Sequence, residues 1–169
     1  MANHREPARD VADQTHVDKL RAVLNICRRM HTMTDLASLQ ALITREAKEL
    51  LHAERVSVFL FDRDKCELWS AISQEGRIMR FDARLGIAGA VAMTGQMINV
   101  ANAYEHPLFY KEVDLQTGYR TQTLLAVPLH SLDGSVIGVG EATNKRAGEF
   151  TDEDAEILAT LAAHLTDLI

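Results

Sequence analysis

Apolar residues recur at helical spacing in two segments before any strand pattern begins. Over residues 17–33 they step by three and four positions, which predicts an amphipathic helix with Val23, Ile26, Met30 and Met33 on its buried face. A second helix is predicted after Asp35, a residue that favours the N-cap position, and its expected buried residues are Leu36, Leu39, Ile43, Ala47 and Leu50. The break at 52–54 ends this region, so two helices precede the first strand.

Strand patterns follow in six segments, which alternate apolar and polar residues or carry short apolar runs bounded by turn residues. They are residues 55–61, 67–73, 77–81, 97–100, 124–129 and 136–143. A short helix closed by a C-terminal glycine is predicted between Gly86 and Gly95, and a last helix is predicted to begin after Thr151. This order of elements predicts an α+β domain built on a six-stranded antiparallel sheet.

The segment 101–121 is long, polar and irregular, and a connection of that length in a compact domain is usually either functional or disordered. Its aromatic residues argue against disorder; they are Tyr104, Phe109, Tyr110 and Tyr119. We therefore expect this segment to be ordered and to take part in function.

The last helix carries a heptad-like seam of Leu158, Leu161, Leu165 and Leu168. One apolar stripe can be buried against a sheet, but this stripe and that of the first helix together would leave apolar surface on a monomer. We therefore predict a parallel homodimer through both terminal helices, because symmetric dimers are the commonest oligomers. The seam reaches Ile169 without a terminating signal, so we also expect a longer protein with an output domain.

The length and charge of the chain narrow its class. With 169 residues, 47% of them apolar, the chain can bury one core, so we assign 15–169 to a single domain and 1–14 to a flexible tail. The net charge of −6 disfavours nucleic acid as a partner, because it would repel a phosphate backbone. No apolar run approaches the roughly 18–20 residues that span a membrane, and the N-terminus lacks a signal-peptide pattern. We expect a cytoplasmic protein without a membrane segment.

Cysteine and histidine, the residue types that most often bind metals or react covalently, are not spaced as in known metal or redox motifs. Cys27 and Cys66 lack CxxC spacing, and the 7 histidines lack HxxxH spacing. We expect no metal site, no disulfide and no cofactor. Since no nucleophile, base and oxyanion donors converge, we do not predict an enzyme.

Four stretches together resemble GAF domains, specifically those of cyclic-nucleotide phosphodiesterases and cyanobacterial adenylyl cyclases. The stretches are 53–62, 86–95, 102–121 and 136–145, within a resemblance that covers about residues 17–169. The resemblance implies both terminal helices on one face of the sheet and a ligand pocket on the other. It also implies a regulatory sensor that binds a cyclic nucleotide, cAMP or cGMP. The rival interpretation is a dimerisation module whose pocket is vestigial or takes a different small ligand.

A cyclic-nucleotide site needs donors for the phosphate, an apolar wall and polar groups that read the base. The resemblance implies ligand contacts at Ser57, Gln74, Ile87, Ala88, Tyr110, Asp114, Thr117, Thr121 and Glu141. The small residues 86–89 would let a phosphate approach backbone amides at a helix N-terminus. Alternatively, they form a tight entry to a buried helix.

Two further patterns support the pocket. Tyr110, Asp114, Thr117 and Thr121 are spaced by four, three and four residues, so a helix would place them on one face, although a capped surface helix is the alternative. Glu141 is expected on the same strand face as Ile137 and Val139, where a carboxylate is costly unless it has a partner.

The family signature resembles Asn144, Lys145, Phe150 and Asp154 in this sequence, whereas Ala155 stands where the family has glutamate. The resemblance implies that Lys145 and Asp154 form a structural ion pair that steadies the segment over the pocket. The alternative is a pair of ordinary solvated charges at the start of a helix.

Overall fold

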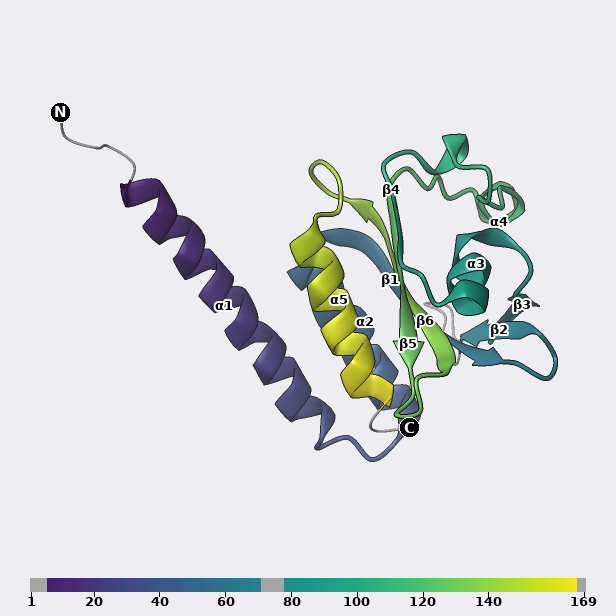
Figure 1. Ribbon diagram of the computed structural model, residues 1–169, viewed down its shortest axis with the longest axis horizontal. Helices are drawn as coiled ribbons and strands as arrows, with labels where there is room; N and C mark the ends of the chain where they lie inside the picture. Colours follow the sequence, from purple (N-terminus) through teal and green to yellow (C-terminus); the bar gives the residue numbers. More distant parts are fainter. Residues whose placement is uncertain (1–5, 71–77, 167–169) are drawn as a thin grey trace.

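The computed structural model describes residues 6–70 and 78–166 (Figure 1). Its helices are α1 (Glu6–Met30), α2 (Leu36–Leu50), α3 (Gly86–Thr94), α4 (Glu112–Thr117) and α5 (Asp152–Thr166), with a 3-10 turn η1 (Ala103–Glu105). Its strands are β1 (Ala53–Asp62), β2 (Glu67–Ser70), β3 (Met79–Asp82), β4 (Ile98–Val100), β5 (Leu124–His130) and β6 (Val136–Lys145). The predicted α+β class is confirmed. The expected turn at 74–76 lies outside the described residues.

The six strands form one antiparallel sheet in the order β3-β2-β1-β6-β5-β4. Figure 1 shows α1, α2 and α5 on one side of this sheet and α3 with α4 on the other. The long central strands β1 and β6 pair through most of their length, and in this register Ser57 faces Glu141. The sheet thus separates a helix face from an α3 face.

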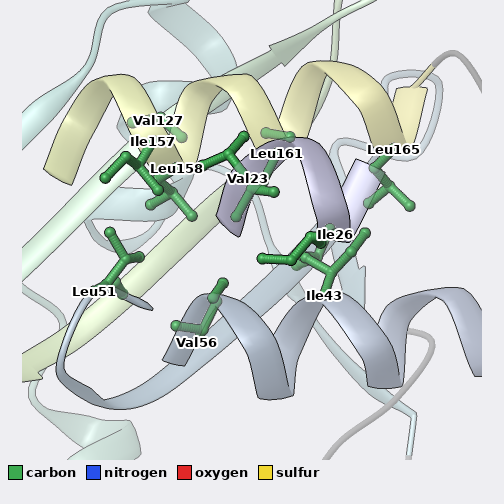
Figure 2. Close-up of a cluster of buried hydrophobic side chains, with 14 of the residues drawn as sticks. Val23, Ile26, Ile43, Leu51, Val56, Val127, Ile157, Leu158, Leu161 and Leu165 are labelled. Atoms are coloured by element: carbon green, nitrogen blue, oxygen red, sulfur yellow. The ribbon is translucent and has the colours of Figure 1, made fainter. Parts of the chain in front are cut away.

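The helix face holds the larger apolar core. Val56 and Val58 of β1 point into it, together with side chains from α1, α2 and α5. Figure 2 shows Leu158, Leu161 and Leu165 pointing toward apolar side chains of the other two helices and the sheet. The expected intermolecular seam is therefore wrong for these three leucines, which are at most 1% exposed within a single chain. The sheet and helices α1 and α2 satisfy the stripe internally, and Leu168 lies outside the described residues.

Side chains cap two of these helices as predicted. Asp35 accepts a hydrogen bond from the Ser38 amide at 2.7 Å, which satisfies one of the free donors at the start of α2. At the start of α5, the Asp154 amide donates to Thr151 Oγ1 at 3.2 Å, and the Thr151 amide donates to Asp154 Oδ2 at 2.9 Å. This reciprocal pair fixes the first turn of α5.

Helix α1 begins earlier than its apolar pattern predicted. It starts at Glu6, so residues 6–14, which were expected in a flexible tail, are helical. Its first turns extend away from the body of the domain (Figure 1), where no core selects for an apolar face. Further along, the exposed side chains include Val17, Leu20 and Leu24, at 40%, 49% and 58% exposure. Among the described helices, none has the length and apolar character needed to cross a membrane.

Candidate functional site

The α3 face of the sheet has a polar floor between apolar walls. Ser57 of β1 and Ala126 of β5 are the cross-strand partners of Glu141. The apolar cluster on this face contains Phe59 and Val139, the next residues on the same side of β1 and β6. A serine and a carboxylate are thus placed side by side within an otherwise apolar surface.

A β-bulge in β6 shows that one predicted neighbour of Glu141, Ile137, was assigned to the wrong face. Leu129 pairs with Gly138, but His130 pairs with Val136, so Ile137 is an extra residue on β6. Extra residues of this kind bend a strand and turn a side chain away from its expected face. Ile137 therefore packs against the core of the helix face and does not share the surface of Glu141.

Burial changes the acidity of Glu141. Its side chain keeps partial access to solvent, yet dense protein surrounds it. Desolvation, followed by the negative charge of Asp114, raises the pKa of Glu141 to about 7. Near neutral pH, this carboxyl group is therefore partly protonated, and a protonated carboxyl both donates and accepts hydrogen bonds.

The residues of the 86–89 motif fit helix packing closely. Gly86 adopts a φ of +76°, which glycine reaches without strain, where the chain enters α3. A Cβ on Gly89 would lie 2.3 Å from the Ala83 carbonyl oxygen, so only glycine fits there. The side chains of Ile87 and Ala88 are 2% and 6% exposed and belong to the apolar cluster under α3. Tight entry to a buried helix accounts for the motif, while the backbone amides at the start of α3 have no side-chain cap from Leu85.

Asp114 joins three parts of the long segment. Its Oδ2 accepts hydrogen bonds from the Tyr104 hydroxyl at 2.9 Å and from the Thr121 amide at 2.7 Å. Its Oδ1 accepts from Thr121 Oγ1 at 2.9 Å, and the residue is only 6% exposed. The hydrogen bond to Asp114 raises the pKa of Tyr104. The carboxylate therefore holds together the beginning, middle and end of residues 104–121.

The predicted single helical face over this segment is wrong. Helix α4 spans only Glu112–Thr117, because Gly118 at a φ of +71° ends it. Asp114 points inward, whereas Thr117 is exposed and donates to the Val113 carbonyl within its own helix. Thr121 lies beyond the helix and bonds to Asp114.

Tyr110 lies at a separate opening. An apolar hollow of about 500 Å³ lies between α3 and residues 107–110, and its lining includes Gly86, Met93, Leu108 and Tyr110. This hollow is open to solvent and borders the N-terminus of α3. Gln74 lies outside the described residues.

Lys145 and Asp154 form a buried ion pair. Lys145 Nζ lies 2.7 Å from Asp154 Oδ2, and their side chains are 12% and 1% exposed. The ammonium group also lies 5.7 Å from the centre of the Phe150 ring. The backbone amide of Lys145 donates to Thr123 Oγ1 at 2.9 Å, so the end of β6 is tied to the residues that follow the long segment.

Asn144 anchors the end of the long segment to β1. In a left-handed conformation with φ of 55°, its Nδ2 donates to Glu54 Oε2 at 2.9 Å and to the Arg120 carbonyl at 2.8 Å. The Tyr119 hydroxyl donates to the same Glu54 oxygen at 3.0 Å, and Arg55 stacks 3.7 Å from the centre of the Tyr119 ring. Hydrogen bonds from Asn144 and Tyr119 lower the pKa of Glu54.

Three residues of the site were not predicted from the sequence, namely Tyr104, Glu54 and Tyr119. Tyr104 and Tyr119 stood out only as aromatic residues that argue for order. Their hydrogen-bond partners lie far along the chain, between ten and 65 residues away, so no local pattern reveals them.

Comparison with known proteins identifies the family. The profile of the GAF domain matches residues 35–167. The chain belongs to the GAF domain family. Its relatives include a probable 3′,5′-cyclic phosphodiesterase of Caenorhabditis elegans, 35% identical over 77% of this chain and 20% of that protein. A cGMP-specific 3′,5′-cyclic phosphodiesterase of Drosophila melanogaster is 37% identical over 90% of this chain and 14% of that protein. The GAF chain thus spans a fifth or less of the length of these relatives.

Solved structures show the same fold. The GAF domain of a phosphoenolpyruvate-protein phosphotransferase from Coxiella burnetii superposes with a TM-score of 0.79 and 22% identity, covering 90% of this chain and 92% of that one. A free methionine-R-sulfoxide reductase from Neisseria meningitidis gives a TM-score of 0.74 with 23% identity, covering 91% and 89%. The expected GAF fold, with both terminal helices on one face, is confirmed.

The two cysteines of this GAF domain lie in different cores. Cys27 is buried in the apolar core of the helix face, where desolvation raises its pKa. Cys66 packs against the cluster on the α3 face and is the last residue of the turn between β1 and β2. Because the sheet separates them, they do not form a paired redox site. Among the described residues, no three His, Cys, Asp or Glu side chains gather as metal ligands.

Proposed function

We propose that this GAF domain is a sensor that binds a cyclic nucleotide on the α3 face of its sheet and signals through α1 and α5. The observation that carries the proposal is the adjacent pair Ser57 and Glu141, two polar groups on the floor of an apolar face. Burying such a pair in an apolar core costs free energy, whereas a ligand with polar edges can form hydrogen bonds with it.

The chemistry of the surroundings suits a nucleotide. A partly protonated Glu141 is able to donate to one base or ribose atom and accept from another, with Ser57 beside it. The uncapped amides at the start of α3 suit a single phosphate. The Drosophila relative is named for cGMP, so cGMP is the first ligand to test and cAMP the second.

Calorimetry on ligand-free protein tests this proposal. We expect micromolar or tighter binding of cGMP or cAMP, and at least tenfold weaker binding in Glu141→Ala, on the order of the loss of one hydrogen bond to a charged group. Glu156→Ala is the matched control, because Glu156 is an exposed glutamate on α5, on the opposite face of the sheet. Folded wild-type protein that gives no heat with either nucleotide would contradict the proposal.

The first turn of α5 offers a route for the signal. Asp154 bonds to Lys145 at the end of β6, and the neighbouring Asn144 donates to the Arg120 carbonyl in the long segment. The preceding residue, Glu153, bonds to Lys19 of α1 at 2.5 Å and to His16 at 2.8 Å. A shift of the long segment on ligand binding therefore reaches α1 through one turn of helix, provided that the ligand favours one arrangement of these elements over the other.

A second function, dimerisation, is favoured by the exposed apolar stripe on α1. Val17, Leu20 and Leu24 follow helical spacing on a helix that extends beyond the body of the domain. The partner we propose is a second copy of this chain, paired α1 to α1. Light scattering is expected to report a dimer that dissociates in a Leu20→Glu, Leu24→Glu variant. Leu132→Glu is the control, because Leu132 is fully exposed in the β5–β6 turn; a monomeric wild-type protein would rule this function out.

A further inference from the structure

The carboxylate of Asp114 already accepts three hydrogen bonds from its own segment. Each of its oxygens accepts at least one hydrogen bond from Tyr104 or Thr121, and the residue is almost fully buried. Three of the roughly four lone-pair sites of the carboxylate are therefore taken, and burial leaves little access to the fourth. This geometry is unlike that of Glu141, for which no hydrogen-bonded partner is seen in the described part of the chain.

Tyr104 is the most distant and most replaceable member of the cluster. Asp114 and Thr121 share two hydrogen bonds, whereas Tyr104 contributes one, from the far end of the segment. The Tyr104 ring is held by Phe109, with centroids 5.1 Å apart, and by the Arg120 guanidinium, 4.2 Å from the ring centre. Its hydroxyl is thus aimed at Asp114 by packing from both ends of the segment.

We propose that Asp114 is a positioning residue that closes residues 104–121 over the α3 face, with Tyr104 as the partner that sets how tightly the segment stays closed. The proposal rests on the proposed function for its effect on a ligand, but the closure itself is a property of the ligand-free domain. It assigns Asp114 to the cover of the site rather than to ligand contact.

Hydrogen exchange in the ligand-free protein tests the closure. The Thr121 amide donates to Asp114, so its exchange reports how often the cluster opens. We expect Tyr104→Phe to speed this exchange by about tenfold, because one hydrogen bond to a charged group is lost, and to lower the global stability by no more than the same amount. Asp114→Asn is expected to speed it further, since an amide nitrogen cannot accept from the remaining donors. An unchanged rate in Tyr104→Phe would overturn the proposal.

Two comparisons separate positioning from a general loss of structure. Thr94→Val removes a hydroxyl that donates to the Ala90 carbonyl on α3, and it should leave Thr121 exchange unchanged. The charge of Asp114 contributes to the raised pKa of Glu141. That pKa, followed by NMR, should therefore fall in Asp114→Asn and stay in place in Tyr104→Phe, where the carboxylate remains. A fall of equal size in both variants would show rearrangement of the whole site and contradict the proposal.

Ligand kinetics supply the last test. In stopped-flow measurements with a fluorescent cGMP analogue, we expect Tyr104→Phe to raise the association and dissociation rates together, because the segment opens more often. If Asp114 were a ligand contact, Asp114→Asn would raise the dissociation rate alone, and that result would overturn the proposal. If no nucleotide binds, the proposed function fails, while the exchange rates of the ligand-free protein still decide the role of Asp114.

Discussion

The two faces of the sheet are built from neighbouring residues of the same strands, yet they differ in kind. On β1, Val56 and Val58 enter the dry core of the helix face, while Ser57 between them lies on the α3 face beside Glu141. The helix face is filled by leucines and isoleucines from three helices, with Figure 2 showing the centre of that packing. The α3 face buries Asp114, Thr121 and part of Glu141 instead. The comparison teaches that alternate residues of one sheet build an apolar core on one side and the partly polar surface of the proposed ligand site on the other.

The largest expected effect is on the helix face. Leu161 is fully buried in the centre of this core. Leu161→Ala should lower the free energy of unfolding by about 4 kcal/mol, because it removes buried apolar area and leaves a cavity. Urea unfolding measures this loss. On the α3 face, Ser57→Ala is the counterpart, and it should change stability by less than about 1 kcal/mol. Equal losses in the two variants would erase the proposed division.

At the edge between the two faces, the Lys145–Asp154 pair is the next test. Asp154→Ala leaves the Lys145 ammonium, only 12% exposed, without its carboxylate and also removes the cap of α5. We expect a loss of about 3 kcal/mol in urea unfolding, in the range for breaking a buried pair. Arg84→Ala breaks an exposed pair with Asp82 and should cost little. A loss no larger in Asp154→Ala than in Arg84→Ala would mean that the Lys145 pair is an ordinary solvated one.

The helix face could be predicted from the sequence more fully than the α3 face. The helix face was predictable because burial repeats at fixed steps, so the order of elements, the Asp35 cap and the Thr151 cap agree with the structure. The spacing of apolar residues does not show which part of the protein, or which second chain, covers an apolar stripe. The leucines of α5 were therefore assigned to a second chain, although α1, α2 and the sheet bury them.

The α3 face was predictable only in part. The family resemblance named Ser57 and Glu141 as ligand contacts, and they lie side by side on the α3 face. The bulge that moves Ile137 depends on pairing with β5 and leaves no local signal. Helical spacing grouped Tyr110 with Asp114, yet Gly118 ends the helix and a buried network replaces the expected face. Such networks join residues far apart in the chain, so only the folded structure shows them.

The pH dependence of the free energy of unfolding tests the α3 face through a smaller expected effect. The pKa of Glu141 is raised from 4.5 to about 7, so the folded protein keeps this proton where the unfolded chain has lost it. The stabilisation is therefore complete below pH 4.5 and is lost as the pH rises through about 7. The partial exposure of Glu141 reduces the expected fall to about 2 kcal/mol. Glu141→Gln should remove this fall from a urea-unfolding series, and parallel pH profiles for the two proteins would contradict the assignment.

The smallest expected effect is a gain in stability, and it concerns a buried polar residue on the helix face. Gln40 of α2 is 2% exposed, and neither its amide nitrogen nor its amide oxygen has a hydrogen-bond partner in the part of the chain that the structure describes. An unpaired buried amide costs desolvation energy without return. Gln40→Met keeps the length of the side chain and should stabilise the domain by about 1 kcal/mol, as measured by urea unfolding. Thr121→Val, which removes a hydroxyl that is paired with Asp114, should instead destabilise it. Opposite signs for these two substitutions would show that the helix face excludes polar groups while the α3 face depends on them; a loss of stability in Gln40→Met would show that the amide is paired in solution.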